Sequence, residues 1–195
     1  MNARVWLDRG TELFLSAVEQ LSDAGLRQPS LLPGWTRAHV IAHVHYNAEA
    51  LRRLVAWAAT GREHRMYAGP HHRQTEIEHG ATLHADALRA LVRLSAADLR
   101  ASLNALPDSA MDHPVITAQG RTVPAREIAW LRAREVAVHA VDLANGVTFD
   151  DLPHEFIAAL VVEAAAKHAA AGQAADLAGW LTGRAADPPR LGSWL

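Results

Sequence analysis

The sequence predicts an all-α fold, in which a four-helix bundle is followed by a short C-terminal segment. Three observations support this prediction. Ala, Leu and Arg are abundant while β-branched alternation is scarce, a composition that favours helices over strands. Four long segments carry apolar residues at helical spacing, and clusters of Pro and Gly separate them. Amphipathic helices of this kind bury their apolar faces against one another, as in a four-helix bundle.

The first two helices are separated by the connector QPSLLPGW. The first helix is expected over residues 3–24. Thr36 is suited to cap the second helix, because its hydroxyl can accept a hydrogen bond from the first turn. That helix is expected to run to about Ala59 and to end at Gly61, because glycine readily adopts the left-handed conformation found just past a helix.

The third and fourth helices complete the bundle. The third is expected over residues 85–105, where leucines and a valine recur at helical spacing. Thr122 and Pro124 are expected to open the fourth helix, since proline suits a first helical turn. This helix is expected to run to about Ala144 and to stop at the Asn-Gly pair that follows.

Two connections within the bundle are long. Residues 62–82 are polar and interrupted by glycine and proline, and we expect a long loop there with a short helix near 71–79. A connection of this length permits a crossover between helices instead of a simple up-and-down arrangement. The stretch before the fourth helix is irregular, with a short extended piece expected at 114–117.

The chain is expected to contain two domains. Residues 1–150 form the helical bundle, and residues 151–195 form a short C-terminal helical segment. Within the second, helices are expected over 153–171 and 176–182, before a Pro-rich tail.

The composition excludes several classes of protein. The 195 residues are 50% hydrophobic and 21% charged, as in a globular protein with a sizeable core. A net charge of -2 gives no reason to expect nucleic acid or an anionic membrane surface as a partner. No apolar run reaches spanning length and the N-terminus lacks a signal-peptide pattern, so we expect a cytoplasmic protein. Cysteine is absent, so any sulfur chemistry must use a sulfur brought from outside.

The stretch REVAVHAVDL places Glu135 and His139 four residues apart, on one face of the fourth helix. The second helix carries His39 and His43 on a similar stripe. If the two helices pack together, one of these histidines meets the Glu135–His139 pair, and two nitrogens and one carboxylate oxygen converge. That donor set suits catalytic zinc with an open position, and it also suits iron, nickel or cobalt. The alternative is that the pair are surface neighbours and that the histidines cap a helix or fill the core.

Four segments of the chain carry a resemblance: LLPGWTRAHVIAHVHYNAEAL, MYAGPHHRQTEIEHGATLHADALR, ITAQGRTVPAREIAWLRAREVAVHAVDL and the terminal WLTGR. They closely resemble the mycothiol-dependent maleylpyruvate isomerase family, which belongs to the DinB/YfiT-like metalloenzymes. The resemblance covers most of residues 5–155 and implies a DinB-like bundle in which the second and fourth helices are neighbours. It assigns the metal ligands to His43, Glu135 and His139, and it leaves His39 out.

The resemblance also implies a function. The family carries zinc and uses mycothiol to convert maleylpyruvate to fumarylpyruvate, a cis–trans isomerisation in gentisate degradation and so in aromatic catabolism. A thiolate suits this reaction, because it can add to the activated double bond, allow rotation about the resulting single bond and leave again. Zinc held by the three ligands would accept the mycothiol sulfur and stabilise its thiolate. The match of LTGR to a Gly-Arg pair of the family implies a catalytic role for Arg184.

The substrate implied by the resemblance is a dicarboxylate, so guanidinium groups are expected to hold it. The candidates are Arg121, Arg132, Arg134 and Arg184. For Arg132 and Arg134 the alternative is a solvated helix face or a salt bridge to the 62–82 loop.

Four further residues are candidates for the site. Asn47, one turn beyond His43, is placed to hydrogen-bond the thiol cofactor or a metal ligand. Tyr67 and Gln119 are candidate pocket residues. Asp142 is suited to orient a metal ligand, or equally to form a salt bridge at the helix end.

One segment departs from the family pattern. AAAKHAAAGQAAD stands where the family has a longer segment with strands, so the second domain is reduced. This departure leaves open an alternative function, a mycothiol-dependent S-transferase that keeps the metal site and alters the substrate arginines. A non-enzymatic, metal-stabilised binding module is a further alternative, and it would have a closed coordination shell. The similarity in loops such as ITAQGRTVPA favours the isomerase, since function tends to lie in loops.

Overall fold

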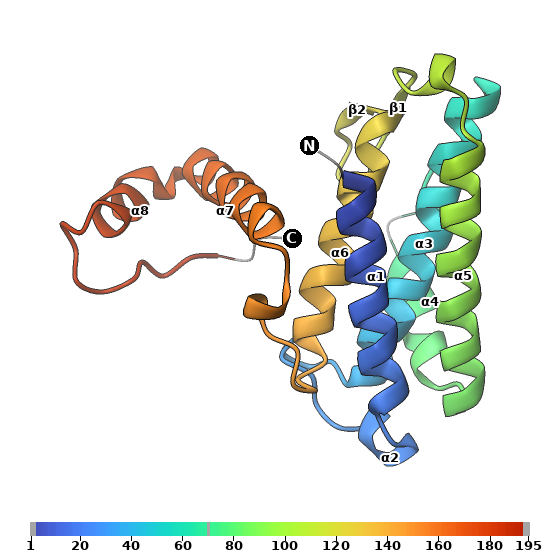
Figure 1. Cartoon of the computed structure of the whole chain (residues 1–195), viewed down its shortest axis with the longest axis horizontal. Helices are drawn as coiled ribbons and strands as arrows, with labels where there is room; N and C mark the ends of the chain where they lie inside the picture. The colour runs from blue at the N-terminus through green and yellow to red at the C-terminus, as the bar shows by residue number, and fades with distance from the viewer. Residues whose placement is uncertain (1–2, 70, 193–195) are drawn as a thin grey trace. The chain divides into compact units, whose positions relative to one another are not determined.

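The computed structural model describes residues 3–69 and 71–192, and the chain forms two compact units. The first unit ends at Asp151 and the second begins at Leu152. The first unit is a bundle of four long helices (Figure 1), as the sequence predicts. They are α1 (Ala3–Gln20), α3 (Arg37–Thr60), α5 (Ala85–Ala105) and α6 (Ile128–Asp142). In the bundle α1 packs on α5 and α6, and α3 also packs on α5 and α6.

The connection between α3 and α5 is a crossover. α6 ends beside the beginning of α3, where the Leu31 amide donates to the Asp142 carbonyl at 2.9 Å, so these two helices are antiparallel. α3 and α5 run in the same direction (Figure 1), and the chain therefore crosses back along the bundle between them. The crossover contains α4 (His72–Ala81), which lies against α3. The short helix predicted near 71–79 is thus confirmed, and it extends to Ala81.

The ends of α3 follow the predicted signals. Thr36 is the N-cap, and its backbone N–H donates to Nδ1 of His39 at 3.2 Å. At the other end, Gly61 adopts a φ of 71° and donates its N–H to the Trp57 carbonyl at 2.8 Å. The predicted span of this helix is therefore confirmed to within one residue.

The first helix is shorter than predicted. α1 ends at Gln20, and a separate short helix, α2 (Asp23–Leu26), occupies the residues expected to continue it. The reason is Ser22, whose hydroxyl accepts the Gly25 N–H at 3.0 Å and starts a new helix with a new direction.

The fourth long helix begins six residues later than predicted. Residues Thr122–Pro124 form the strand β2, which pairs antiparallel with β1 (Pro114–Ile116), and a 3₁₀ turn follows before α6. Val115 and Val123 are paired across this hairpin, and both are buried. Burial of this pair outweighs the preference of proline for a helical first turn. The extended piece predicted at 114–117 is confirmed at 114–116, but its partner strand was missed.

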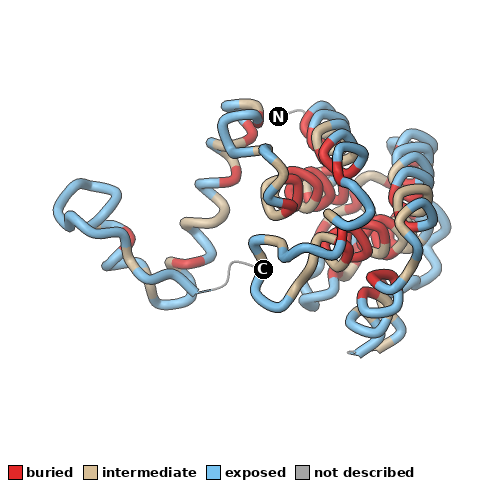
Figure 2. The backbone as a smooth tube through the Cα atoms, turned by 90° about the horizontal axis from the view of Figure 1, so that it is seen from below, coloured by how far each residue is buried: buried red, intermediate tan, exposed pale blue. Residues whose placement is uncertain are grey.

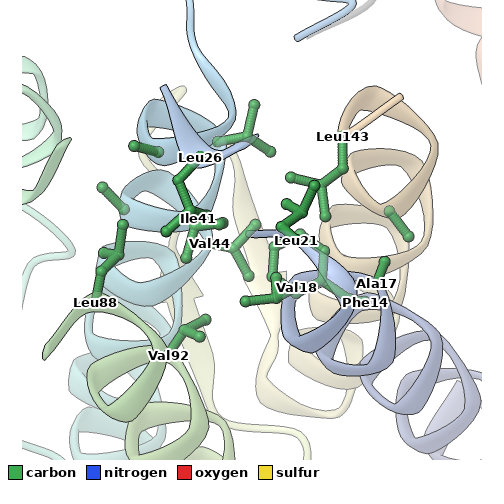
Figure 3. Packing of buried hydrophobic residues seen from close by; sticks show 14 of the residues in the cluster. Phe14, Ala17, Val18, Leu21, Leu26, Ile41, Val44, Leu88, Val92 and Leu143 are labelled. Carbon is green, nitrogen blue, oxygen red and sulfur yellow. The ribbon is translucent and has the colours of Figure 1, made fainter. Parts of the chain in front are cut away.

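The core lies between the four helices, where buried residues line the inward faces (Figure 2). One apolar cluster joins residues of α1, α3, α5 and α6, and Val136 is its member on α6. Figure 3 shows Phe14, Ile41 and Val92 of this cluster. Burying each of the larger side chains contributes roughly 1.5–3 kcal/mol. This packing fixes α3 against α6, the helices that carry the predicted metal ligands.

The second unit contains α7 (His154–His168) and α8 (Ala174–Leu181). The predicted helices are present, but α7 passes at Ala169 into a π-helical segment and the chain bends at Gly172, where φ is 89°. Among residues 3–69 and 71–192, no helix is both long enough and apolar enough to cross a membrane.

Candidate metal centre

His43 from α3 and the pair Glu135 and His139 from α6 meet inside the bundle. One ligand atom from each residue lies within 4.8 Å of the others. Oε2 of Glu135 is 2.9 Å from Nε2 of His43 and 3.4 Å from Nε2 of His139. The four-residue spacing places Glu135 and His139 on the same face of α6, and the antiparallel packing of α3 brings His43 to that face.

The cluster lies at the edge of the core. His43 is 3% exposed and His139 is 7% exposed, whereas the Glu135 side chain keeps 14% of its surface. The Trp35 ring lies beside His43, with a centroid distance of 5.7 Å. The three polar side chains are therefore largely screened from solvent, and Glu135 is the most exposed of them.

Without a metal ion, the three side chains of the cluster differ in protonation. Burial lowers the pKa of His43 to about 4, although its hydrogen bond to Glu135 opposes this change. Burial alone would lower the pKa of His139 too, but hydrogen bonds to Asp142 and Glu135 outweigh burial and raise it to about 9. Burial opposes ionisation of Glu135 as well, and the two histidines nevertheless hold its pKa well below the usual range. At neutral pH the cluster is a carboxylate, an imidazolium and a neutral imidazole.

Each histidine has a partner for its second ring nitrogen. Nδ1 of His139 donates to Oδ2 of Asp142 at 2.8 Å. Nδ1 of His43 accepts from Nη2 of Arg73, on α4, at 3.3 Å. This contact fits both roles predicted for Asp142, because it is an ion pair at the end of α6 and because metal-binding histidines usually donate their other N–H to a carboxylate.

The donor set fits a divalent cation. The Nε2 atoms of both histidines face the same carboxylate oxygen of Glu135, so two nitrogens and one oxygen converge on one small volume. Two imidazoles and one carboxylate are typical ligands of catalytic zinc and leave a coordination position open. His39, the other histidine considered, points away from this volume: its Nδ1 contacts Thr36, and its Nε2 lies 3.3 Å from Glu78.

Arg132 differs from the expectation of a solvated helix face or a salt bridge to the 62–82 loop. Its side chain is only 1% exposed, inside the bundle. Nη1 donates to the Val44 carbonyl at 2.7 Å and to Oδ1 of Asn47 at 2.8 Å. Burial lowers the pKa of Arg132 to about 10. The Asn47 oxygen is thus already engaged with Arg132, and Arg134 too is buried, with 6% exposed.

The remaining candidates lie in two places. Tyr67 lines a cavity of about 370 Å³, and burial raises the pKa of its hydroxyl. Gln119 and Arg121 are exposed in the turn between β1 and β2, where Arg121 is 3.8 Å from Glu127. Arg184 belongs to the second unit, where it is exposed and donates to the Thr182 carbonyl.

Arg73 is the residue that sequence reasoning missed. It lies in the short helix predicted near 71–79, but the prediction does not say which face of that helix packs against the bundle. The spacing of Arg73, Ile77 and Gly80 was a usable signal, because these residues share one face of α4 and the last two are buried against α3.

Comparisons with known proteins identify a matching family and two similar structures. A family model described as "Mycothiol maleylpyruvate isomerase N-terminal domain" matches residues 7–144. The crystal structure of a mycothiol-dependent maleylpyruvate isomerase is similar, with a TM-score of 0.81 and 44% sequence identity over 86% of this chain and 68% of that chain. The structure of a histidine-to-alanine mutant of a mycothiol-dependent maleylpyruvate isomerase is similar at 43% identity, with the same TM-score and coverage. No curated protein matches the chain.

Proposed function

The chain belongs to the mycothiol maleylpyruvate isomerase family, and we propose that it is a zinc- and mycothiol-dependent enzyme. The proposed reaction is the cis–trans isomerisation of maleylpyruvate to fumarylpyruvate, a step of gentisate degradation. The cluster of His43, Glu135 and His139 supports this proposal best, because it lies within the matched residues 7–144 and offers a divalent cation three ligands and an open position.

His43, Glu135 and His139 would hold the zinc ion. When bound, this ion supplies a position for the mycothiol sulfur and lowers the pKa of the thiol, so that a thiolate is available at neutral pH. With a divalent zinc ion held by two neutral imidazoles and one carboxylate, the site would carry a net positive charge, which favours an incoming anion. Asp142 holds His139 in the orientation that presents Nε2 to the site, and Trp35 helps to exclude water.

The isomerisation proceeds by addition of the thiolate to the double bond, rotation about the bond and elimination. The chain has no cysteine, so the nucleophile is the mycothiol sulfur. We propose Arg184 as a catalytic residue because it matches the Gly-Arg pair of the family. In the structure its guanidinium contacts only the Thr182 carbonyl among the described residues, and a substrate carboxylate is a stronger partner than a carbonyl.

The test joins metal analysis to an activity assay. The purified protein is expected to contain about one zinc ion per chain and to convert maleylpyruvate only when mycothiol is present. His43→Ala is expected to lose both zinc and activity. His39→Ala, one turn earlier on the same helix, is the matched control and is expected to keep both. Zinc retained in His43→Ala, or isomerisation without mycothiol, would overturn the proposal.

A second candidate is a mycothiol-dependent S-transferase on the same metal site. It is favoured by the segment AAAKHAAAGQAAD, which stands where the family has a longer segment with strands. Product analysis separates the two functions, because an isomerase releases mycothiol unchanged whereas a transferase consumes it in a conjugate.

A further inference from the structure

A cavity adjoins the metal centre. It has a volume of about 370 Å³. Its lining comes from the part of the crossover between α3 and α4, here called the crossover loop, with Arg65 and Tyr67, from Arg73 at the start of α4, and from residues 116–118 at the end of β1 and just after it. Arg73 connects this cavity to the cluster, because its Nη2 is 3.3 Å from Nδ1 of His43. A molecule in the cavity that contacts Arg73 is therefore linked through this one side chain to His43, a predicted metal ligand.

Arg73 is a cation without an anionic partner among the described residues. Its contacts are the His43 ring nitrogen and the Tyr67 hydroxyl, and no carboxylate lies within ion-pair distance. Arg65, on the same cavity, differs because its Nε is 2.6 Å from Oε1 of Glu63 and its side chain is largely exposed. A partly buried guanidinium beside a cavity is best stabilised by a carboxylate, because the two carboxylate oxygens can accept hydrogen bonds from two of its N–H groups.

A second guanidinium, that of Arg132, interacts with Tyr67 without lining the cavity. Arg132 is fully buried, and its charge interacts with Tyr67 and Glu135. Its Nη2 atom has no hydrogen-bond partner among the described residues. Tyr67 therefore interacts with the positive charges of Arg73 and Arg132 and with the negative charges of Glu76 and Glu135, of which Glu135 is compensated by the two histidines.

The contact between Arg73 and His43 is suited only to the metal-free site. A histidine that uses Nε2 for a metal carries its proton on Nδ1. Arginine has donors and no acceptor, so Arg73 cannot hydrogen-bond a protonated Nδ1. When the metal site is occupied, the guanidinium is free to bind an anion in the cavity.

We propose that Arg73, with Tyr67 beside it, forms the subsite that binds a carboxylate of the substrate. The proposal rests on the proposed function, in which the substrate is a dicarboxylate. It gives the crossover loop and α4 a role in specificity: they select substrates that carry a carboxylate at a set distance from the double bond.

The test compares three variants of the zinc-loaded full-length protein. Arg73→Met removes the charge, Arg73→Lys keeps a charge without the planar pair of donors, and Arg65→Met removes the other arginine of the same cavity. Calorimetry measures the binding of maleate, a cis-dicarboxylate, without mycothiol, so no turnover is needed. Steady-state kinetics give kcat and KM for maleylpyruvate, and zinc content is measured in each variant.

Arg73→Met is expected to weaken maleate binding and to raise KM by about 10- to 100-fold, since a hydrogen-bonded charge is lost. Zinc content and the KM for mycothiol are expected to stay unchanged. Arg73→Lys is expected to be intermediate, and Arg65→Met to resemble the wild type. Unchanged maleate binding in Arg73→Met would overturn the inference, as would a loss of zinc or of kcat with KM unchanged, which would mean that Arg73 only positions His43.

The same measurements separate this inference from the proposed function. If the wild type binds maleate through Arg73 but does not isomerise maleylpyruvate, the carboxylate subsite stands and the proposed reaction fails. If the wild type is active and Arg73→Met keeps its KM, the reaction stands and the subsite fails.

Discussion

His139 lies between two carboxylates, with Nδ1 at 2.8 Å from Asp142 and Nε2 at 3.4 Å from Glu135. Its pKa of about 9 means that the metal-free protein holds a proton on this imidazole at neutral pH. His43, with a pKa of about 4, is already neutral there. A metal ion that takes Nε2 of His139 must therefore displace one proton, and the affinity for zinc must depend on pH.

The sign of this dependence follows from the raised pKa of His139. Between pH 6 and 8 the zinc affinity is expected to rise by about tenfold per pH unit, and to level off above about pH 9, where the proton is already lost. Calorimetry in buffers of different ionisation enthalpy is expected to detect about one proton released per zinc at pH 7. Asp142→Asn removes one of the carboxylates that raise this pKa, so fewer protons are expected to be released at pH 8. Equal release from both proteins at pH 8 would contradict this account of Asp142.

At the residue scale, spacing placed Glu135 and His139 on one face but could not choose between His39 and His43. The choice depends on which side of α3 faces α6, and His39 is instead occupied at the helix N-terminus by Thr36. The burial of Arg132 was not predictable either. Its partners, the Val44 carbonyl and Asn47, are on another helix, 88 and 85 residues away in the sequence.

At the element scale, the closest packing of α4 on α3 occurs at Gly80. A Cβ atom there would lie 2.7 Å from Cβ of Ala42 and 3.0 Å from the Tyr46 ring. Gly80→Ala is therefore expected to destabilise the protein by about 1–3 kcal/mol, because the clash with Ala42 exceeds the gain in helix propensity. Chemical denaturation measures the change in the free energy of unfolding.

The matched control for Gly80→Ala is Gly69→Ala, in the crossover loop, where an added Cβ would meet nothing within 4 Å. It is expected to change the free energy of unfolding by less than about 0.5 kcal/mol. Since α4 carries Arg73, Gly80→Ala is also expected to weaken maleate binding. An unchanged stability of Gly80→Ala would mean that α4 is free to move away from α3 without cost.

Helix boundaries were predictable where the signal is local. Thr36 and Gly61 mark the ends of α3, and the span of α5 agrees with the predicted 85–105. The prediction failed where the deciding partner is remote. Thr122–Pro124 forms a strand because it pairs with Pro114–Ile116, and no property of Thr122 or Pro124 alone reveals that pairing.

At the scale of the whole molecule, the order of helices does not determine which of them are neighbours. α1 and α3 are consecutive among the four long helices, yet α1 packs mainly on α6 and α3 packs mainly on α5. The adjacency of α3 and α6, on which the candidate metal centre depends, came from the resemblance and not from periodicity. In the structure α3 packs on both α5 and α6, and the crossover that contains α4 lets α3 and α5 run in the same direction (Figure 1).

The division of the chain at Asp151 leads to the last prediction. The three predicted metal ligands and the apolar cluster all lie before Asp151, so a chain truncated after this residue is expected to fold and to bind about one zinc ion. Its isomerase activity is expected to fall by about 100-fold or more, because it lacks Arg184.

The full-length variant Arg184→Gln tests the same role without removing a unit. It is expected to keep its zinc content and its thermal unfolding transition, and to lose activity to the same extent as the truncated chain, since each lacks the same guanidinium. If the truncated chain is inactive while Arg184→Gln is fully active, the C-terminal unit contributes through other residues and the catalytic role of Arg184 is wrong. If the truncated chain fails to bind zinc, the first unit does not fold independently of the second.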